Sequence, residues 1–314
     1  MASLILFGPQ RLNPILKPEL DGLGLDGSVA AVTAGWQERE REDEELQRHI
    51  ERPLLNLRLH SRAEQVFSDD QELFKAHRAR QDRLQALQRL YRYRLDFVLE
   101  PARELMRRGG DPELLDRERD SAIEAIRLLD REHLMRAAEI HQEFEREWHP
   151  TRRDSVAVHR DEIYELLQQS SAVLIAGGHV AVLLNRMRLF GLADLVREMP
   201  ILAWSAGAMA LAERVVLFHD SPPQGAGNPE VLDAGLGLYR GLIPLPHARH
   251  RLRLEDPVRV SLLARRFAPD TCVPLDEKMC VRRSTLGLSV GWETGHGALE
   301  LSASGRVIPL GDGV

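Results

Sequence analysis

A short apolar run that ends in a lone serine constrains the fold of this chain more than any other stretch. Residues 201–204 read as a buried strand, Ser205 follows at once, and residues 206–214 read as a helix. A strand that turns sharply into a helix lifts the residue at the turn out of the sheet and directs the free N–H groups of the helix toward it. The neighbours are small, although Ala203 stands where the G-x-S-x-G pattern has its first glycine. The pattern predicts a layered α/β fold with Ser205 at a nucleophile elbow.

The first and last parts of the chain have the residue pattern of an α/β domain. Residues 1–60 alternate apolar runs with turns and one charged helical segment, in the order β-β-α-β. The same kind of pattern begins again near residue 154, where it predicts a helix, a buried strand, a Gly-Gly turn, a second helix and a series of short strands. We therefore expect one α/β domain, formed by residues 1–60 and 151–314, with a mostly parallel sheet sandwiched by helices.

Residues 61–150 differ from both flanks, because they are highly charged and carry apolar residues at helical spacing. Asp111 suits the N-cap and Pro112 the first position of a second helix. The segment thus predicts an inserted long helical hairpin, with a kink at Pro101 as one option. It could be a solvated insertion, an arm that forms a homo-oligomer, or a lid over the site.

Composition narrows the class of protein. The 314 residues are 43% hydrophobic, enough for a substantial core, and a net charge of −6 gives no general affinity for nucleic acid. The N-terminus has no signal-peptide pattern, and no apolar run is long enough to span a membrane. The two cysteines, Cys272 and Cys280, lack metal-like spacing. We expect a cytoplasmic protein with no metal, no cofactor and no nucleic-acid or membrane partner.

A catalytic serine needs a base, an orienting acid and donors for an oxyanion. The sequence offers candidates for each: Gly178 and the N–H of Ala206 as donors, His247 or His250 as the base, and Asp220, Asp276 or Glu277 as the acid. Each of these, taken singly, also fits an ordinary turn, cap or surface position.

The motifs together resemble a known family. In order they are Gly177-Gly178 after a strand, W-S-A-G-A around Ser205, H-D-S-P around Asp220, P-H at His247 and L-D-E at Glu277. This order is similar to the serine peptidase family of dipeptidase E and cyanophycinase, which has the class I glutamine amidotransferase-like fold. The resemblance covers residues 154–314 well and 1–60 loosely, and it does not cover the helical insertion.

The resemblance implies a role for each matching residue. Ser205 would be the nucleophile, Gly178 and Ala206 the oxyanion donors and His247 the base. Asp220 is the first choice for the acid, as in the dipeptidase branch, and Glu277 the second, as in the cyanophycinase branch. The substrate-binding candidates are Gly177, His179, Arg249 and Arg251, since an arginine can pair with an acidic substrate group.

One departure affects the substrate. The family's usual G-G-N-T reads Gly177-Gly-His-Val180 here, so an amide and a hydroxyl are missing from the pocket. The prediction is a serine hydrolase or peptidase that cleaves a small peptide or an acidic, isopeptide-like amide through an acyl-enzyme. The alternative is a non-catalytic relative that binds a small molecule or a partner protein. A glutamine amidotransferase is disfavoured because it uses cysteine at the elbow, and an α/β-hydrolase because its histidine comes later in the chain.

Overall fold

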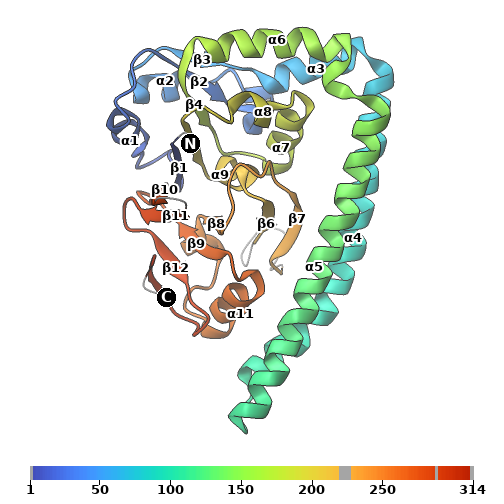
Figure 1. The fold of residues 1–314 in the computed structure, drawn as a ribbon, viewed down its shortest axis with the longest axis vertical. Helices are drawn as coiled ribbons and strands as arrows, with labels where there is room; N and C mark the ends of the chain where they lie inside the picture. The colour runs from blue at the N-terminus through green and yellow to red at the C-terminus, as the bar shows by residue number, and fades with distance from the viewer. Residues whose placement is uncertain (1–2, 219–227, 287–288, 312–314) are drawn as a thin grey trace.

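A seven-stranded, mostly parallel sheet lies at the centre of the computed structural model, which describes residues 3–218, 228–286 and 289–311 (Figure 1). The strand order is β11-β10-β1-β5-β4-β2-β3, in which the last five are parallel, while β10 runs antiparallel to both of its neighbours, β1 and β11. The strands are β1 Leu4–Phe7, β2 Ser28–Val32, β3 Leu54–Asn56, β4 Ser170–Ile175, β5 Ile201–Trp204, β10 Cys280–Leu286 and β11 Ser289–Thr294. The predicted α/β class with a mostly parallel sheet is confirmed.

Helices cover both faces of this sheet, as the near-continuous apolar strands require. Leu6 of β1 belongs to the core on one face, whereas its neighbour Phe7 belongs to the core on the other. The Phe7 face packs on α1 Leu16–Gly22 and α2 Glu44–Ile50. The Leu6 face packs on α3 Leu59–Asp69, α6 Asp154–Gln168, α7 Val180–Leu189, α8 Leu192–Val196 and α9 Ala206–Leu211. In the described part of the chain, the 3-10 helix η1 Ala34–Arg39 lies between β2 and α2, and the 3-10 helix η2 Pro150–Arg152 precedes α6.

The predicted β-β-α-β opening is wrong in one respect, because helix α1 separates β1 from β2. The helix has only seven residues, Leu16-Lys-Pro-Glu-Leu-Asp-Gly22. Seven residues are too few to show a helical periodicity, and Pro18 makes the segment look even less like a helix in the sequence. A proline is tolerated in the first turn of a helix, where its missing N–H has no partner to lose.

Beyond Ser205 the chain adds three small two-stranded sheets. The strands are β6 Arg214–Leu217 with β7 Glu230–Ala234, β8 Leu242–Pro246 with β9 Thr271–Leu275, and β12 Leu299–Leu301 with β13 Val307–Pro309. Helices α10 Ala248–Arg251 and α11 Pro257–Phe267 lie between β8 and β9. The predicted helix 206–214 ends early at Leu211, and the β-branched run around Val215 forms β6 instead. The other short strands expected in the tail are present, except that part of 287–290 lies outside the described residues.

The predicted helical hairpin is confirmed as α4 Gln71–Arg107 and α5 Pro112–Trp148. Asp111 caps α5 as expected, because its carboxylate accepts hydrogen bonds from the N–H groups of Glu113 (3.0 Å) and Leu114 (3.3 Å). Helix α4 continues through Pro101 rather than ending there. The hairpin runs along one flank of the body and its tip projects beyond it (Figure 1). Within the described residues, no helix combines the length and the apolar character needed to span a membrane.

A buried ion pair ties the hairpin to α11. Arg266 makes two hydrogen bonds of 2.7 Å to the carboxylate of Asp130 on α5 and one of 2.9 Å to the hydroxyl of Tyr91 on α4. Tyr91 also donates to Asp130 (2.7 Å) and stacks on His133. All four side chains are buried, so both helices of the hairpin are joined to the body through one shared set of polar contacts.

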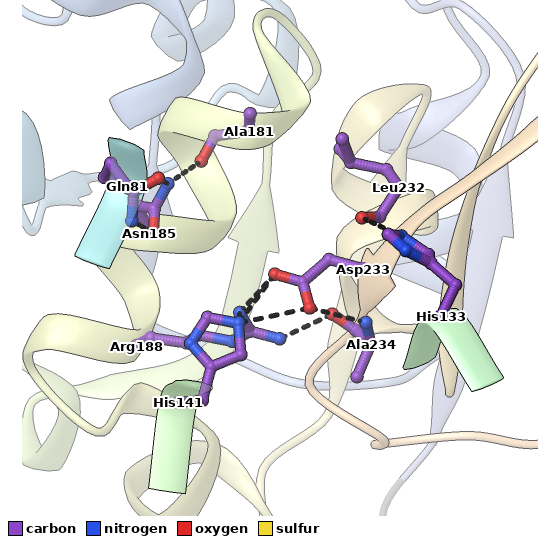
Figure 2. A network of polar contacts seen from close by, with 9 residues as sticks. All are labelled: Gln81, His133, His141, Ala181, Asn185, Arg188, Leu232, Asp233 and Ala234. Carbon is purple, nitrogen blue, oxygen red and sulfur yellow. Dashed lines mark hydrogen bonds and ion pairs between the residues drawn. The ribbon is translucent and has the colours of Figure 1, made fainter. Parts of the chain in front are cut away.

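A second polar cluster lies further along the hairpin (Figure 2). His141 of α5 and Arg188 of α7 approach the carboxylate of Asp233 on β7 at 2.9 and 2.7 Å. Burial alone would raise the pKa of Asp233, but its hydrogen bonds with His141 and Arg188 lower the pKa to about 2. Asp233 therefore stays ionised at neutral pH. The cluster links the hairpin to α7, the helix that follows the Gly-Gly turn.

Candidate active site

Ser205 stands between β5 and α9 in a strained backbone conformation. Its φ is 51° and its ψ is −120°, a region that residues with a Cβ rarely adopt. Its N–H donates to Phe7 O (3.1 Å), and its carbonyl accepts from the N–H of Met209 (3.2 Å). Backbone hydrogen bonds to β1 and to α9 therefore fix the position of the elbow. The side chain is partly exposed and does not cap α9.

Two glycines make this elbow possible. A Cβ at Gly207 would lie 2.3 Å from the carbonyl oxygen of Ile175, so no side chain fits there. A Cβ at Gly177 would lie 2.9 Å from the Cβ of Ser205 and 3.6 Å from the nitrogen of Ala206. The Gly-Gly turn after β4 therefore lies directly against the serine, as expected of two adjacent parallel strands whose carboxyl ends share one edge.

The two predicted oxyanion donors face this same edge. Gly178 has φ 118°, and a Cβ there would lie 2.3 Å from the carbonyl oxygen of Gly35. Among the residues that the structure describes, the N–H groups of Gly178 and Ala206 donate to no acceptor. Unsatisfied N–H groups beside a serine hydroxyl are available for a ligand oxygen.

His179, predicted to bind substrate, has a structural contact of its own. Its Nδ1 accepts a hydrogen bond from the N–H of Val182 (3.3 Å) and so caps helix α7. Its N–H donates to Gly35 O (2.8 Å), and the residue is exposed. The ring is therefore oriented by the helix, with Nε2 free of this cap contact.

Sequence reasoning missed Gln37, which lies two residues after Gly35 on η1. Its φ of 59° and ψ of −124° are close to the values of Ser205. The residue with the positive φ is a glutamine and not a glycine, so the segment Ala34-Gly-Trp-Gln37 gave no sequence signal for this conformation. Strain of this kind gathers at ligand-binding segments, which adds Gln37 to the candidate residues near the Gly-Gly turn.

His247 follows β8 in the left-handed conformation, with φ 59° and ψ 33°. Its N–H donates to Leu275 O (3.1 Å). Burial lowers the pKa of the ring, and the charges of Arg251 and His250 lower it further, while Glu277 raises it. The imidazole is therefore neutral at pH 7, the state that a general base requires.

Backbone packing brings the segments of Ser205 and His247 to the same end of the sheet. Phe7 of β1 pairs with Trp204, the residue before Ser205. The next residue, Gly8, packs so closely on the β9 end that a Cβ there would lie 1.9 Å from the carbonyl oxygen of Asp276. His247 bonds to the residue before Asp276, as given above. Within the described part of the chain, no hydrogen bond joins the Ser205 hydroxyl to the His247 ring. Such contacts are often long in unliganded enzymes and shorten when substrate binds.

The candidate acids differ in their surroundings. Asp276 is buried and accepts a hydrogen bond from the N–H of Arg249 (3.1 Å), and burial raises the pKa of its carboxyl. Glu277 is exposed, accepts a 2.6 Å hydrogen bond from Asn13 and is the carboxylate whose charge acts on His247. Asp220 lies outside the described residues.

The predicted arginines flank the histidine differently. The Arg249 side chain is 66% exposed, with its Nε 3.6 Å from Asp276. Arg251 is more enclosed, and burial lowers its pKa. Both arginines lie within four residues of His247 in the sequence. Of the two, Arg251 is the one whose charge lowers the pKa of the His247 ring. The described residues contain no cluster of His, Cys, Asp or Glu that could hold a metal ion.

In the comparisons with known proteins, this chain matches solved structures, but it matches no protein-family model and no curated protein sequence. The crystal structure of a peptidase from an acI-B1 Actinobacterium aligns with 99% of this chain and 97% of its own, at 12% identity and a TM-score of 0.46. A protein from Listeria monocytogenes EGD-e, named only provisionally as a Peptidase E, aligns with 43% of this chain and 65% of its own, at 17% identity and a TM-score of 0.30. These scores are too low to assign an activity, so the function is argued from the residues themselves.

Proposed function

We propose that this protein is a serine hydrolase that cleaves a small peptide or an isopeptide-like amide through an acyl-enzyme. The backbone of Ser205 carries the proposal. A conformation that costs on the order of 1–3 kcal/mol needs a reason to persist. The usual structural reason for a serine at the start of a helix is capping, and Ser205 makes no cap hydrogen bond. Its partly exposed hydroxyl is thus held at a tight turn without a structural role.

The proposed reaction uses the groups around this turn. The Ser205 hydroxyl attacks the amide carbonyl while His247 takes its proton, and a C–O bond forms. The N–H groups of Gly178 and Ala206 hold the developing oxyanion. His247 then protonates the departing amine as the C–N bond breaks. A water molecule, activated by the same ring, hydrolyses the acyl-enzyme and restores the serine.

The acid and the substrate group are part of the same proposal. The charge of Glu277 on His247 supports Glu277 as the acid, and Asp220 stays the alternative from the sequence. Arg249 and Arg251 suit an acidic substrate side chain or carboxylate. Gly177 and His179 would line the pocket, and residues 1–60 and 151–314 would form the catalytic unit, with 61–150 as an insertion.

A binding module without catalysis is the second candidate. It is favoured by one observation, that the Ser205 hydroxyl and the His247 ring are not hydrogen-bonded in the described structure. In that case the same pocket would hold a small acidic ligand and leave it intact.

Labelling with a fluorophosphonate probe separates the two candidates. We expect near-stoichiometric labelling of the wild type and of Ser304→Ala, which removes an exposed serine. Ser205→Ala should not be labelled, and His247→Asn should label at least about 100-fold more slowly. Equal labelling of wild type and Ser205→Ala would remove the catalytic assignment.

Substrate profiling then tests the amide chemistry. Dipeptides with N-terminal aspartate and β-aspartyl dipeptides should be cleaved by the wild type and not by Ser205→Ala. Of Glu277→Gln and Asp220→Asn, the variant that lacks the true acid should lose about 10³- to 10⁴-fold in kcat, as is typical for that member of a triad. A labelled enzyme that cleaves none of these compounds would refute the proposed substrate class while leaving the nucleophile in place.

A further inference from the structure

The hairpin exposes a cluster of large apolar side chains to solvent. Their exposed fractions range from 51% to 68%. Leu90, Tyr93 and Phe97 lie on α4, and Leu128 and Met135 lie on α5. We call this set the outer patch. Isolated exposed apolar residues are common, but five gathered on one pair of helices mark an interaction surface.

An ion pair shows that these side chains share one face. Arg94 of α4 and Glu132 of α5 lie 2.9 Å apart across the hairpin. Leu90 and Phe97 stand four residues before and three residues after Arg94. Leu128 and Met135 stand at the same offsets from Glu132. Residues at these offsets follow one another along a single face of a helix.

The outer patch points away from the body. Tyr91 and Leu95 of α4, with Leu129 and His133 of α5, are buried on the side that meets β7 and α11. Figure 1 shows the hairpin along one flank of the body, with its far side uncovered. No other part of the described chain shields the outer patch.

The outer patch is complementary to itself in one arrangement. A two-fold axis parallel to the helices places α4 of one copy against α5 of the other. Leu90 then faces Met135 and Phe97 faces Leu128, while Arg94 of each copy faces Glu132 of its partner. A two-fold axis across the helices instead places α4 on α4, with like charges opposed at Arg94. Like charges placed together across an interface oppose association.

We propose that the protein forms a homodimer in which two hairpins pack outer patch to outer patch as a four-helix bundle, with their tips pointing the same way. Each helix is about 55 Å long and two adjacent helices are about 20 Å wide, so the whole outer face of the hairpin covers about 1,100 Å², and the outer patch is the apolar part of this face. A stable interface needs about 800 Å² per partner. Charged pairs such as Arg83–Glu143 border the apolar centre and form a polar rim.

Sedimentation velocity over a range of concentrations tests the dimer. The wild type should sediment as a dimer in the low micromolar range. Phe97→Ser and the single charge reversals Arg94→Glu and Glu132→Arg should each raise the dissociation constant by about 100-fold. The matched control, Tyr164→Ser on α6, removes an exposed aromatic side chain outside the hairpin and should leave the dimer intact.

Mixing the two charge-reversal variants tests the arrangement itself. Arg94→Glu and Glu132→Arg form opposite-charge pairs only with each other, so their mixture should recover a heterodimer that neither variant forms alone as a homodimer. A wild type that is monomeric at about 100 micromolar, where a face of this size should hold two copies together, would overturn the proposal. A mixture that stays monomeric would overturn it as well. Labelling of Ser205 should be unchanged in Phe97→Ser, which keeps this test independent of the proposed activity.

Discussion

At the scale of single residues, the conformation of Ser205 connects stability with function. Its positive φ suits glycine, which has no Cβ to strain. The same conformation recurs at Gln37, beside the Gly-Gly turn, as described above. Two strained residues on neighbouring loops indicate that this end of the sheet is shaped for something other than packing.

Replacing Ser205 separates strain from chemistry. We expect the free energy of unfolding of Ser205→Gly to exceed that of Ser205→Ala by about 1 kcal/mol, because glycine relieves the backbone strain. Both variants should be inactive. At Ser261, inside helix α11, the order should reverse, since glycine weakens a helix relative to alanine. Urea denaturation of the four variants measures this. A Ser205→Gly variant that is no more stable than Ser205→Ala would show that Ser205 is not strained.

The surroundings of His247 predict the pH dependence of activity. The base acts only when neutral, and its pKa lies below 6.5, first because of burial and then because of Arg251 and His250. The value of kcat/KM should therefore fall only as the pH drops below 6.5. Arg251→Gln removes a charge that lowers the pKa and should move this fall to higher pH. Glu277→Gln should move it to lower pH.

An exposed arginine provides the control for these pH profiles. Arg240 has a side chain that is 80% exposed and lies 3.6 Å from Glu213, so Arg240→Gln should leave the midpoint in place. If Arg251→Gln and Glu277→Gln move the midpoint in the same direction, His247 is not the group that titrates.

At the scale of elements, buried polar groups join the hairpin to the body. Sequence periodicity identified the hairpin because each helix repeats its pattern over 37 residues. The same periodicity did not reveal the contacts of Asp130 and Arg266, which are 136 positions apart. Helix α1 was missed for the opposite reason, because seven residues are too few to repeat a pattern.

The ion pair between Arg266 and Asp130 gives a stability test. Arg266→Met leaves the Asp130 carboxylate buried without its partner and should lower the free energy of unfolding by about 3–5 kcal/mol. The double variant Arg266→Met/Asp130→Leu removes both charges and should be clearly more stable than the single one. The neighbouring Arg265 serves as the control. Its ion pair with Asp120 is partly exposed, with side chains that are 34% and 74% accessible, and its replacement by methionine should cost less than about 1 kcal/mol. A double variant no better than Arg266→Met would refute this role.

At the scale of the whole molecule, the candidate site and the outer patch occupy separate regions. The site gathers at the carboxyl ends of β1, β4 and β5, where open α/β sheets bind their ligands. The outer patch lies on the side of the hairpin opposite the side chains that are buried against the body, and the hairpin itself runs along one flank of that body (Figure 1). Association through the hairpin would thus leave the proposed active site accessible.

The sequence alone determined what depends on neighbours along the chain. The strand, small-residue turn and helix around Ser205 were predictable because sheet and helix periodicities and the glycines are local properties. The same holds for the Gly-Gly turn, the Asp111 cap and the long hairpin. His247 could be proposed only through the resemblance to a known family, because nothing in its own segment distinguishes it from His250.

The tertiary structure decided the relations between distant segments. It placed Gly8 and Asp276 between the Ser205 and His247 segments. It also brought the charge of Glu277, rather than that of Asp276, to act on His247. Finally, it directed one face of the hairpin to solvent. These outcomes depend on strand order and on burial, which sum over contacts far apart in the chain. No local pattern encodes them, since the free energy of each contact exists only once the sheet has assembled.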